Sequence, residues 1–270
     1  MMKKQLLAIA AMALCAFATS CSKDDNTTND PNNPNNPNTG KSSLSMYLTD
    51  GPGDYDAVYL DIQSVEVTMD GQSPVTLNAI RPGIYDLLKF SNGTDTLLAR
   101  ADVPSGSIEQ IRLILGSNNS VVVNNISYPL ITPSGQTSGI KLNLHDSLVA
   151  GNAYNIWIDF DAAKSIHQTG NGKYMLKPVV RAYSALTNGR IKGFVLPLSA
   201  LATVYAINGV DTFSAIPEVT DGFFLISGLP QANYNVLFDA GDTTLKDTMY
   251  LNVPVTFGVE TNLGAVTLVP

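Results

Sequence analysis

Stretches in which every second residue is apolar dominate this chain from residue 44 onward, and they restrict what it can fold into. Side chains of a β-strand point alternately to the two faces of its sheet, so a period of two predicts strands with one buried face. The cleanest runs are Tyr154, Ile156, Ile158 and Phe160, and Tyr234, Val236 and Phe238. No long helical periodicity accompanies them. The chain is therefore predicted to be all-β.

A change of parity inside one such stretch predicts a β-bulge. Apolar residues occupy even positions first and odd positions afterwards, namely Val58, Leu60 and Ile62, then Val65, Val67 and Met69. One extra residue in one strand of a pair produces this shift and bends the strand.

Turn signals separate the short apolar runs. They combine Asn or Asp with Gly, which accept the left-handed backbone of tight turns, at Asp70-Gly71, Asn92-Gly93, Asn188-Gly189 and Asp221-Gly222. Many short strands with such turns are typical of antiparallel β-sandwiches of Ig-like form. Short helical turns are expected only near Tyr85–Phe90 and Ala162–Ile166.

The N-terminus has the layout of a secretory signal. Lys3 and Lys4 precede an apolar run from Leu6 to Phe17, and small residues follow before Cys21. The run is shorter than the roughly 20 residues that span a bilayer. A charged start, an apolar run and a small-residue cleavage site predict a signal peptide that is removed.

The residues around the cut resemble the lipobox of bacterial lipoproteins, in the run Ala18-Thr19-Ser20-Cys21. This resemblance implies lipidation of Cys21 and a membrane anchor. Ser22-Lys23-Asp24-Asp25 resembles the export signal that sends lipoproteins of the Bacteroidetes to the outer face of the outer membrane. The alternative is an ordinary signal peptide with a coincidental cysteine. Residues 26–40 carry no core-forming side chain and are expected to form a disordered tether.

Cysteine and charge counts exclude several classes of function. The chain has two cysteines, one inside the signal and one at the lipid site, so none is left for a disulfide, a metal or a nucleophile. Removal of the signal takes two lysines from the 16 basic residues and leaves 14 against 23 acidic ones. Nucleic acid is therefore not an expected partner. Such binding depends mainly on contacts of Lys and Arg with phosphate groups, and a chain with an excess of acidic residues repels phosphates.

Phrases in the first half resemble the domain of unknown function 4382 family, over about residues 43–184. They include Leu48-Thr49-Asp50-Gly51-Pro52, Ser138-Gly139-Ile140-Lys141, Asp159-Phe160-Asp161-Ala162-Ala163-Lys164 and Lys173-Tyr174-Met175-Leu176-Lys177-Pro178. The family has no established activity, so the resemblance implies a β-sandwich fold and no mechanism.

The last part of the chain resembles the carboxypeptidase regulatory-like, transthyretin-like module. The matching phrases are Gly189-Arg190-Ile191-Lys192-Gly193, Ile226-Ser227-Gly228-Leu229-Pro230 and Asn233-Tyr234-Asn235-Val236. The resemblance implies a seven-stranded, non-catalytic sandwich with a structural or binding role. We predict a signal peptide at 1–20, a lipidated N-terminus and linker at 21–42, and sandwiches at 43–186 and 187–270.

An acidic, glycine-rich loop is the candidate metal site. Asp50, Asp54 and Asp56 place three carboxylates within a few residues, and calcium prefers several oxygen ligands on flexible loops. The spacing lacks the EF-hand pattern and its distal glutamate. The alternative is a solvated turn in which Asp50 caps backbone amides.

The candidate ligand site lies at the end of the strand predicted around Tyr154–Phe160. Trp157, Asp159 and Asp161 share one face of this strand. An exposed indole beside carboxylates suits sugar stacking and hydrogen bonding. The alternative is a strand end at which the acids cap the helical turn that follows.

No catalytic motif accompanies these residues. The only histidines, His145 and His167, lack a metal-ligand spacing, and GxSxG, Walker and GxGxxG patterns are absent. We expect a non-catalytic, outer-membrane surface lipoprotein that binds a glycan or an envelope or matrix partner. The alternatives are a structural or accessory subunit of a surface fibre or uptake complex, and a glycoside hydrolase that uses Asp159 and Asp161.

Overall fold

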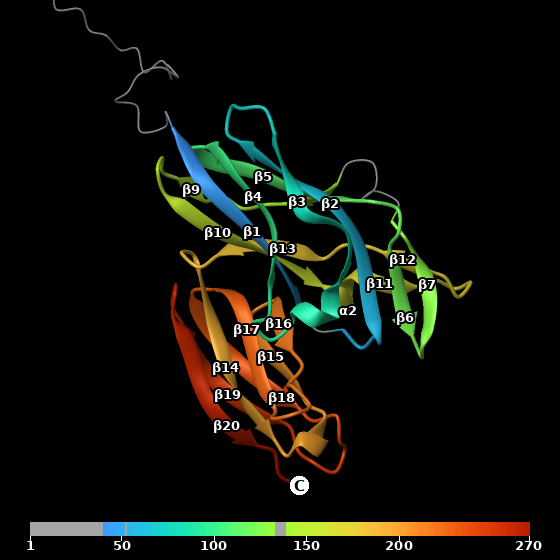
Figure 1. Cartoon of the computed structure of the whole chain (residues 1–270). Coiled ribbons are helices and arrows are strands. Elements are labelled where there is room, and N and C mark those ends of the chain that lie inside the picture. The colour runs from blue at the N-terminus through green and yellow to red at the C-terminus, as the bar shows by residue number, and fades with distance from the viewer. Residues whose placement is uncertain (1–39, 52, 133–138) are drawn as a thin grey trace, which may run out of the picture.

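The computed structural model describes residues 40–51, 53–132 and 139–270. The expectations for the signal peptide, Cys21 and most of the linker lie outside these residues. The described chain is mostly β, with short helical segments between strands. Figure 1 shows two units, with the earlier strands above and the red and orange strands of the C-terminal part below.

Across residues 40–51, 53–132 and 139–184, the first unit has thirteen strands. They are β1 (Lys41–Gly51), β2 (Ala57–Met69), β3 (Val75–Asp86), β4 (Thr96–Pro104), β5 (Gly106–Leu115), β6 (Ser120–Val123), β7 (Ile126–Ile131), β8 (Ile140–Leu142), β9 (Ser147–Leu148), β10 (Ala153–Asp161), β11 (Ile166–Gln168), β12 (Tyr174–Leu176) and β13 (Val180–Ser184). They join into one sheet in the order β11-β12-β7-β6-β2-β3-β4-β1-β10-β13, while β5 branches from β2 and pairs with β8 and β9.

This arrangement corrects the prediction of an antiparallel sandwich for the first unit. One continuous sheet curls around a single apolar core, to which β1, β2, β5 and β10 all contribute. β10 pairs with β1 in parallel, and β12 pairs with β7 in parallel. Twist accumulates along a long sheet and is increased by bulges, so the sheet can close over its own apolar face.

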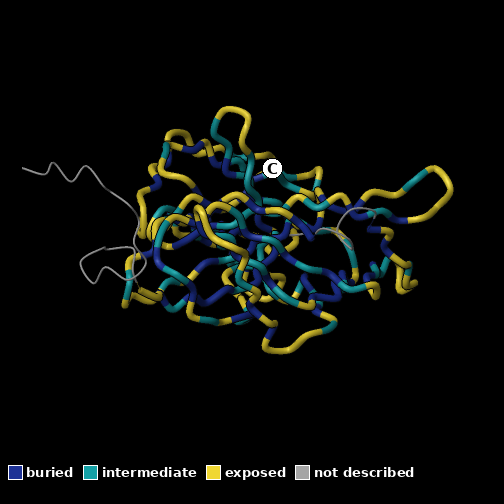
Figure 2. The backbone as a smooth tube through the Cα atoms, turned by 90° about the horizontal axis from the view of Figure 1, so that it is seen from above, coloured by how far each residue is buried: buried dark blue, intermediate teal, exposed yellow. Residues whose placement is uncertain are grey.

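The parity change in β2 is a bulge, as the sequence predicts. The register of β2 against both β3 and β5 shifts between Ile62 and Ser64. Val58, Leu60 and Ile62 on one side of the shift, and Val65, Val67 and Met69 on the other, are all fully buried. The bulge thus keeps apolar side chains on the core side along the whole bent strand. In Figure 2 the outlying loops of the described chain are mostly exposed, while the buried stretches lie further in.

The second unit encloses its own core between two sheets. Its strands are β14 (Asn188–Leu196), β15 (Thr203–Asn208), β16 (Asp211–Ala215), β17 (Phe223–Pro230), β18 (Ala232–Asp239), β19 (Thr248–Val255) and β20 (Glu260–Thr267). One sheet has the order β17-β14-β20 and the other β16-β15-β18-β19. Phe224 and Phe238 meet edge to face between the sheets, with ring centroids 5.8 Å apart. β14 and β20 are parallel, which again departs from the all-antiparallel prediction.

Three short helical segments complete the described part of the fold. They are η1 (Leu87–Phe90), α2 (Ala162–Ser165) and η2 (Leu198–Ala200). The first two lie within the ranges from which the sequence predicts helical turns. The prediction of a turn at Asn188-Gly189 is wrong. The chain turns at residues 185–187, and Asn188 is already the first residue of β14.

Candidate functional site

Trp157 lies in a ladder of three aromatic rings. Tyr47 of β1, Trp157 of β10 and Tyr183 of β13 are paired across neighbouring strands. The indole stacks on Tyr47 with centroids 5.4 Å apart and on Tyr183 with centroids 5.7 Å apart. Its Nε1 donates a hydrogen bond to Asp95 Oδ2 at 2.7 Å. Both faces of the indole are therefore covered, and the exposed stacking surface expected from the sequence is not present.

The other end of the ladder contacts the second unit. A Cβ atom added at Gly228 of β17 would lie 2.5 Å from a carbon of the Tyr183 ring, so the glycine backbone packs directly on this ring. Burial raises the pKa of the Tyr183 hydroxyl far above its usual value, and the nearby Asp159 charge raises it further. The ladder is thus part of the junction between the two units.

Asp159 holds an arginine that joins the two units. Arg181 Nε donates to Asp159 Oδ2 at 2.6 Å, and both groups belong to the first unit. The other guanidinium nitrogens donate to the carbonyls of Ser227 and Gly228 at 2.8 and 2.7 Å. The guanidinium also lies 4.4 Å from the centroid of the Phe213 ring. Asp159 therefore orients a cation that spans the junction.

Asp161 has the capping role that the sequence analysis offered as an alternative. Its Oδ1 accepts a hydrogen bond from the Lys164 amide at 2.9 Å, which makes it the N-cap of α2. Lys164 Nζ lies 2.9 Å from Asp161 Oδ2 and donates to the Thr212 carbonyl of the second unit at 3.1 Å. Asp159 and Asp161 line a hollow of about 200 Å³, and internal contacts engage both carboxylates.

Asn92 is a junction residue that sequence reasoning missed. It occupies the predicted Asn-Gly turn with a φ of 50°, as expected there. Its Nδ2 donates to the Ile216 carbonyl and to Glu218 Oε1, both at 2.9 Å, and its Oδ1 accepts from the Leu225 amide at 3.3 Å. An Asn-Gly pair signals a turn, but nothing in the local sequence signals contacts with residues more than a hundred positions away.

The three acids of the predicted calcium loop lie in different surroundings. Asp56 Oδ2 accepts from the Asn125 amide at 2.7 Å, and Asp54 is exposed. Asp50 is 6% exposed on the core side of β1, and within the described chain neither of its carboxylate oxygens has a hydrogen-bond partner. Across residues 40–51, 53–132 and 139–270, no cluster of three His, Cys, Asp or Glu side chains suits a metal ion.

Burial makes Asp50 difficult to ionise. Desolvation raises the pKa of its carboxyl well above the usual value, and the negative charge of Asp159 acts in the same direction. A buried carboxylate without a partner is costly, so such a group holds its proton more tightly.

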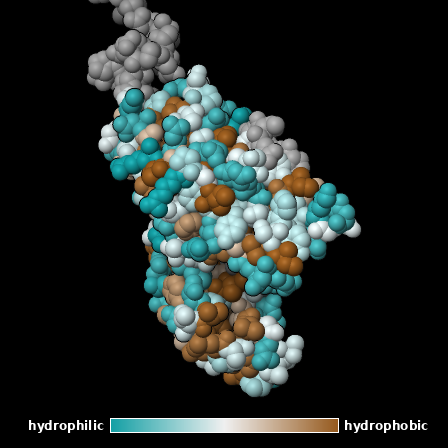
Figure 3. Space-filling view, turned by 45° about the vertical axis from the view of Figure 1, so that its right-hand side comes forward, coloured by the Kyte–Doolittle hydropathy of each residue, from teal (hydrophilic) through white to brown (hydrophobic). Residues whose placement is uncertain are grey.

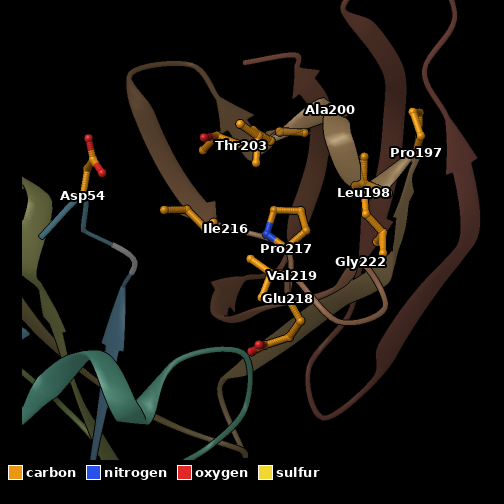
Figure 4. Close-up of a pocket in the computed structure, with 13 residues that line it drawn as sticks. Asp54, Pro197, Leu198, Ala200, Thr203, Ile216, Pro217, Glu218, Val219 and Gly222 are labelled. Atoms are coloured by element: carbon orange, nitrogen blue, oxygen red, sulfur yellow. The ribbon is translucent and has the colours of Figure 1, made fainter. Parts of the chain in front are cut away.

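A groove of about 410 Å³ lies where the second unit meets the Asp54 loop. Its lining is mainly apolar and includes Leu198, Leu201, Ile216 and Val219, with Asp54 and Glu218 as its two carboxylates. Figure 4 shows Asp54 on one side of the pocket, with Leu198 and Pro197 on the opposite side. In Figure 3 apolar side chains gather over the lower, C-terminal part of the molecule, where the surface is hollowed. Sequence reasoning did not find this groove, because its residues come from separate loops.

Within the described ranges, no helix has the length and apolar character needed to cross a membrane.

Comparisons with solved structures give distant likenesses only. A chain of a type II cohesin–X-dockerin complex from Acetivibrio cellulolyticus is 18% identical, with 30% of this chain and 56% of that chain covered and a TM-score of 0.24. This protein thus spans about half of that chain. The minor pilin of Streptococcus agalactiae is 9% identical, with coverage of 84% and 97% and a TM-score of 0.21. The shaft pilin of Lactobacillus rhamnosus GG is 9% identical, with coverage of 85% and 97% and a TM-score of 0.24.

Scores this low carry no argument about function, and comparison with the curated proteins gave no match. The family comparison is more specific. Residues 41–178, which form just over half of the chain, match the family described as domain of unknown function DUF4382. They include β1 to β12, and with them the aromatic ladder up to Trp157 and both junction acids. The chain therefore belongs to the DUF4382 family.

Proposed function

We propose that this protein is a non-catalytic lipoprotein of the outer-membrane surface, anchored through lipid on Cys21, which binds a partner of the cell envelope. The signal, the lipobox-like cysteine and the Asn- and Pro-rich linker support the anchor. The seven strands of the second unit, in two sheets over one core, support its assignment as a transthyretin-like module.

The observation that carries the non-catalytic proposal is the use of the junction side chains. A general acid or base must be positioned to exchange a proton with its substrate. Asp159 is held by Arg181, Asp161 caps α2 and pairs with Lys164, and the indole between Tyr47 and Tyr183 has both faces covered. These groups join the two units, which suits a body that presents a surface to a partner.

The anchor is tested by metabolic labelling with palmitate and by protease treatment of intact cells. We expect label on the wild-type chain, loss of label and release from membranes for Cys21→Ala, and digestion of the wild-type protein from outside the cell. A Cys21→Ala protein that stays on the membrane, or a wild-type protein that resists external protease as periplasmic proteins do, would refute the proposal.

Catalysis is tested directly by a glycoside hydrolase screen. We expect no turnover of polysaccharide substrates by the wild-type chain. Turnover that disappears in Asp159→Asn or Asp161→Asn while the fold persists would replace this proposal with the hydrolase alternative.

The strand edges of the second unit favour a second candidate function, that of a structural subunit. Within the described residues β19 and β20 each pair on one side only, so each has an edge to which another chain could add a strand. Light scattering on detergent-solubilised protein distinguishes the two functions. Ordered oligomers that dissociate on Leu251→Pro in β19 would favour the structural role, and monomers would favour the binding role.

A further inference from the structure

We propose that the junction groove is a docking site for an extended peptide segment of a partner protein, in which an apolar side chain lies next to Lys or Arg. This inference rests on the proposed binding function and specifies the partner's chemistry. The groove is defined here by its lining residues Leu198, Leu201, Ile216 and Val219, together with the carboxylates of Asp54 and Glu218. Its volume of about 410 Å³ lies in the usual range of ligand sites.

The apolar wall of the groove is exposed although nothing in the described chain covers it. Leu201 is 73% exposed and Val219 is 78% exposed, and Leu198 and Ile216 are exposed beside them. Single exposed apolar residues are ordinary, but several around one hollow mark a site of interaction. Burial of such side chains by a partner is favourable at roughly 25 cal/mol per Å² of apolar surface.

Leu201 adds an independent signal, because its backbone is strained. It follows η2 with φ 45° and ψ 41°, a left-handed conformation that bulky residues avoid. Asn or Gly would serve better there if the position were only a helix cap. Leu201 therefore costs free energy both through its strained backbone and through its exposed apolar side chain. Strained backbone positions concentrate at ligand-binding sites.

Charge sets the second half of the partner's chemistry. The described lining contains two carboxylates and no Lys, Arg or His. Glu218 receives a neutral Asn92 amide on Oε1, so its negative charge is not balanced there, and Asp54 lies in an exposed loop of the first unit. A cation beside an apolar side chain complements this groove, whereas anionic lipid headgroups are repelled by it.

The test selects peptides with the detergent-solubilised full chain as bait and a phage-displayed library of random linear peptides as the probe. We expect the selected sequences to share an apolar residue within two positions of Lys or Arg. Fluorescence polarisation with one selected peptide then measures affinity. Leu201→Asn and Val219→Ser should each weaken binding about tenfold or more, as loss of a central contact does. Val210→Ser, which removes a 97% exposed apolar side chain outside the groove, should have no effect.

The charge requirement is tested separately. Asp54→Asn combined with Glu218→Gln should weaken binding and remove most of its salt dependence, while Glu109→Gln on an exposed strand position should not. Gln at 218 keeps the oxygen that accepts from Asn92. Leu201→Asn should keep or raise the melting temperature, because Asn adopts the left-handed region more readily than Leu. Lost binding in a stable variant thus reports the contact and not the fold.

Several outcomes would overturn the inference. They are a selection without consensus, a consensus without a basic residue, equal loss of binding in Val210→Ser, and self-association through the groove that Leu201→Asn abolishes. The last would assign the groove to a second copy of the chain. These failures are distinct from failure of the proposed function, because palmitate labelling and surface protease digestion read out the anchor without reference to the groove.

Discussion

At the scale of single residues, the carboxyl group of Asp50 should make the stability of the protein depend on pH. Its carboxyl is buried at the edge of the core and its raised pKa results from burial first and from the Asp159 charge second. A carboxyl group whose pKa is raised in the folded state stabilises the fold fully at pH values below its unfolded-state pKa of about 3.9. This contribution is lost as the pH rises through the folded-state pKa. The wild-type chain therefore carries an energetic cost at neutral pH that a neutral side chain avoids.

We expect Asp50→Asn to stabilise the protein by about 1 kcal/mol or more at pH 7, and the advantage to shrink as pH falls toward 4. Urea unfolding at a series of pH values measures this difference. Asp102→Asn, at an exposed position of β4, is the matched control and should show no such trend. An Asp50→Asn protein that is less stable at pH 7, or whose advantage is constant with pH, would contradict this account.

At the scale of elements, alternation predicts strands well because it is local. The run at Tyr154–Phe160 lies within β10, the parity change predicts the bulge in β2, and Asp161 with the short turn after it forms a capped α2. The parallel pairing of β10 with β1 could not be predicted, since residues a hundred positions apart leave no joint pattern in one sequence. The junction contacts of Asn92 and the groove escape prediction for the same reason.

Gly189 shows how a local signal can mislead. The Asn188-Gly189 pair predicts a turn, yet Gly189 is buried in β14, where a Cβ atom would collide with the Thr256 carbonyl oxygen. The glycine is there for close packing of the chain and not for its backbone freedom.

We therefore expect Gly189→Ala to destabilise the protein by about 2 kcal/mol through overpacking. Gly170→Ala is the matched control, because a Cβ there meets nothing within 4 Å. Urea unfolding of both variants measures the effect. Equal stability of the two variants would show that position 189 tolerates a side chain. It would contradict the explanation that Gly189 is required for close packing.

At the scale of the whole molecule, two separate apolar cores are joined largely by polar contacts. The first core draws on β1 to β12 and the second on β14 to β20. Arg181, Asn92 and Lys164 cross between the units with hydrogen bonds, and Tyr183 packs on Gly228. The second unit, at roughly 80 residues, is near the size at which a core becomes marginal by itself, so these contacts should couple its unfolding to that of the first.

Arg181→Gln tests this coupling, because it leaves Asp159 buried without its cation and removes two bonds to the second unit. The Arg181 side chain is 33% exposed, so loss of its ion pair with Asp159 costs less than loss of a fully buried pair, about 2 kcal/mol. We expect calorimetry to show one transition for the wild-type chain and two for this variant, with the second unit melting first. Fluorescence of Trp157, the single tryptophan, should follow the later transition, because its ladder belongs to the first unit.

Lys89→Gln is the control for this experiment. It removes an ion pair with Asp86 whose lysine is 75% exposed, and such pairs contribute at most about 1 kcal/mol. It should leave a single transition at nearly the wild-type temperature. Arg181→Gln could also unfold in one transition, with a change in melting temperature no larger than that of Lys89→Gln. The two units would then be held together by contacts other than those of Arg181. The groove, which depends on the relative position of the units, would then have to be explained without the Arg181 contacts.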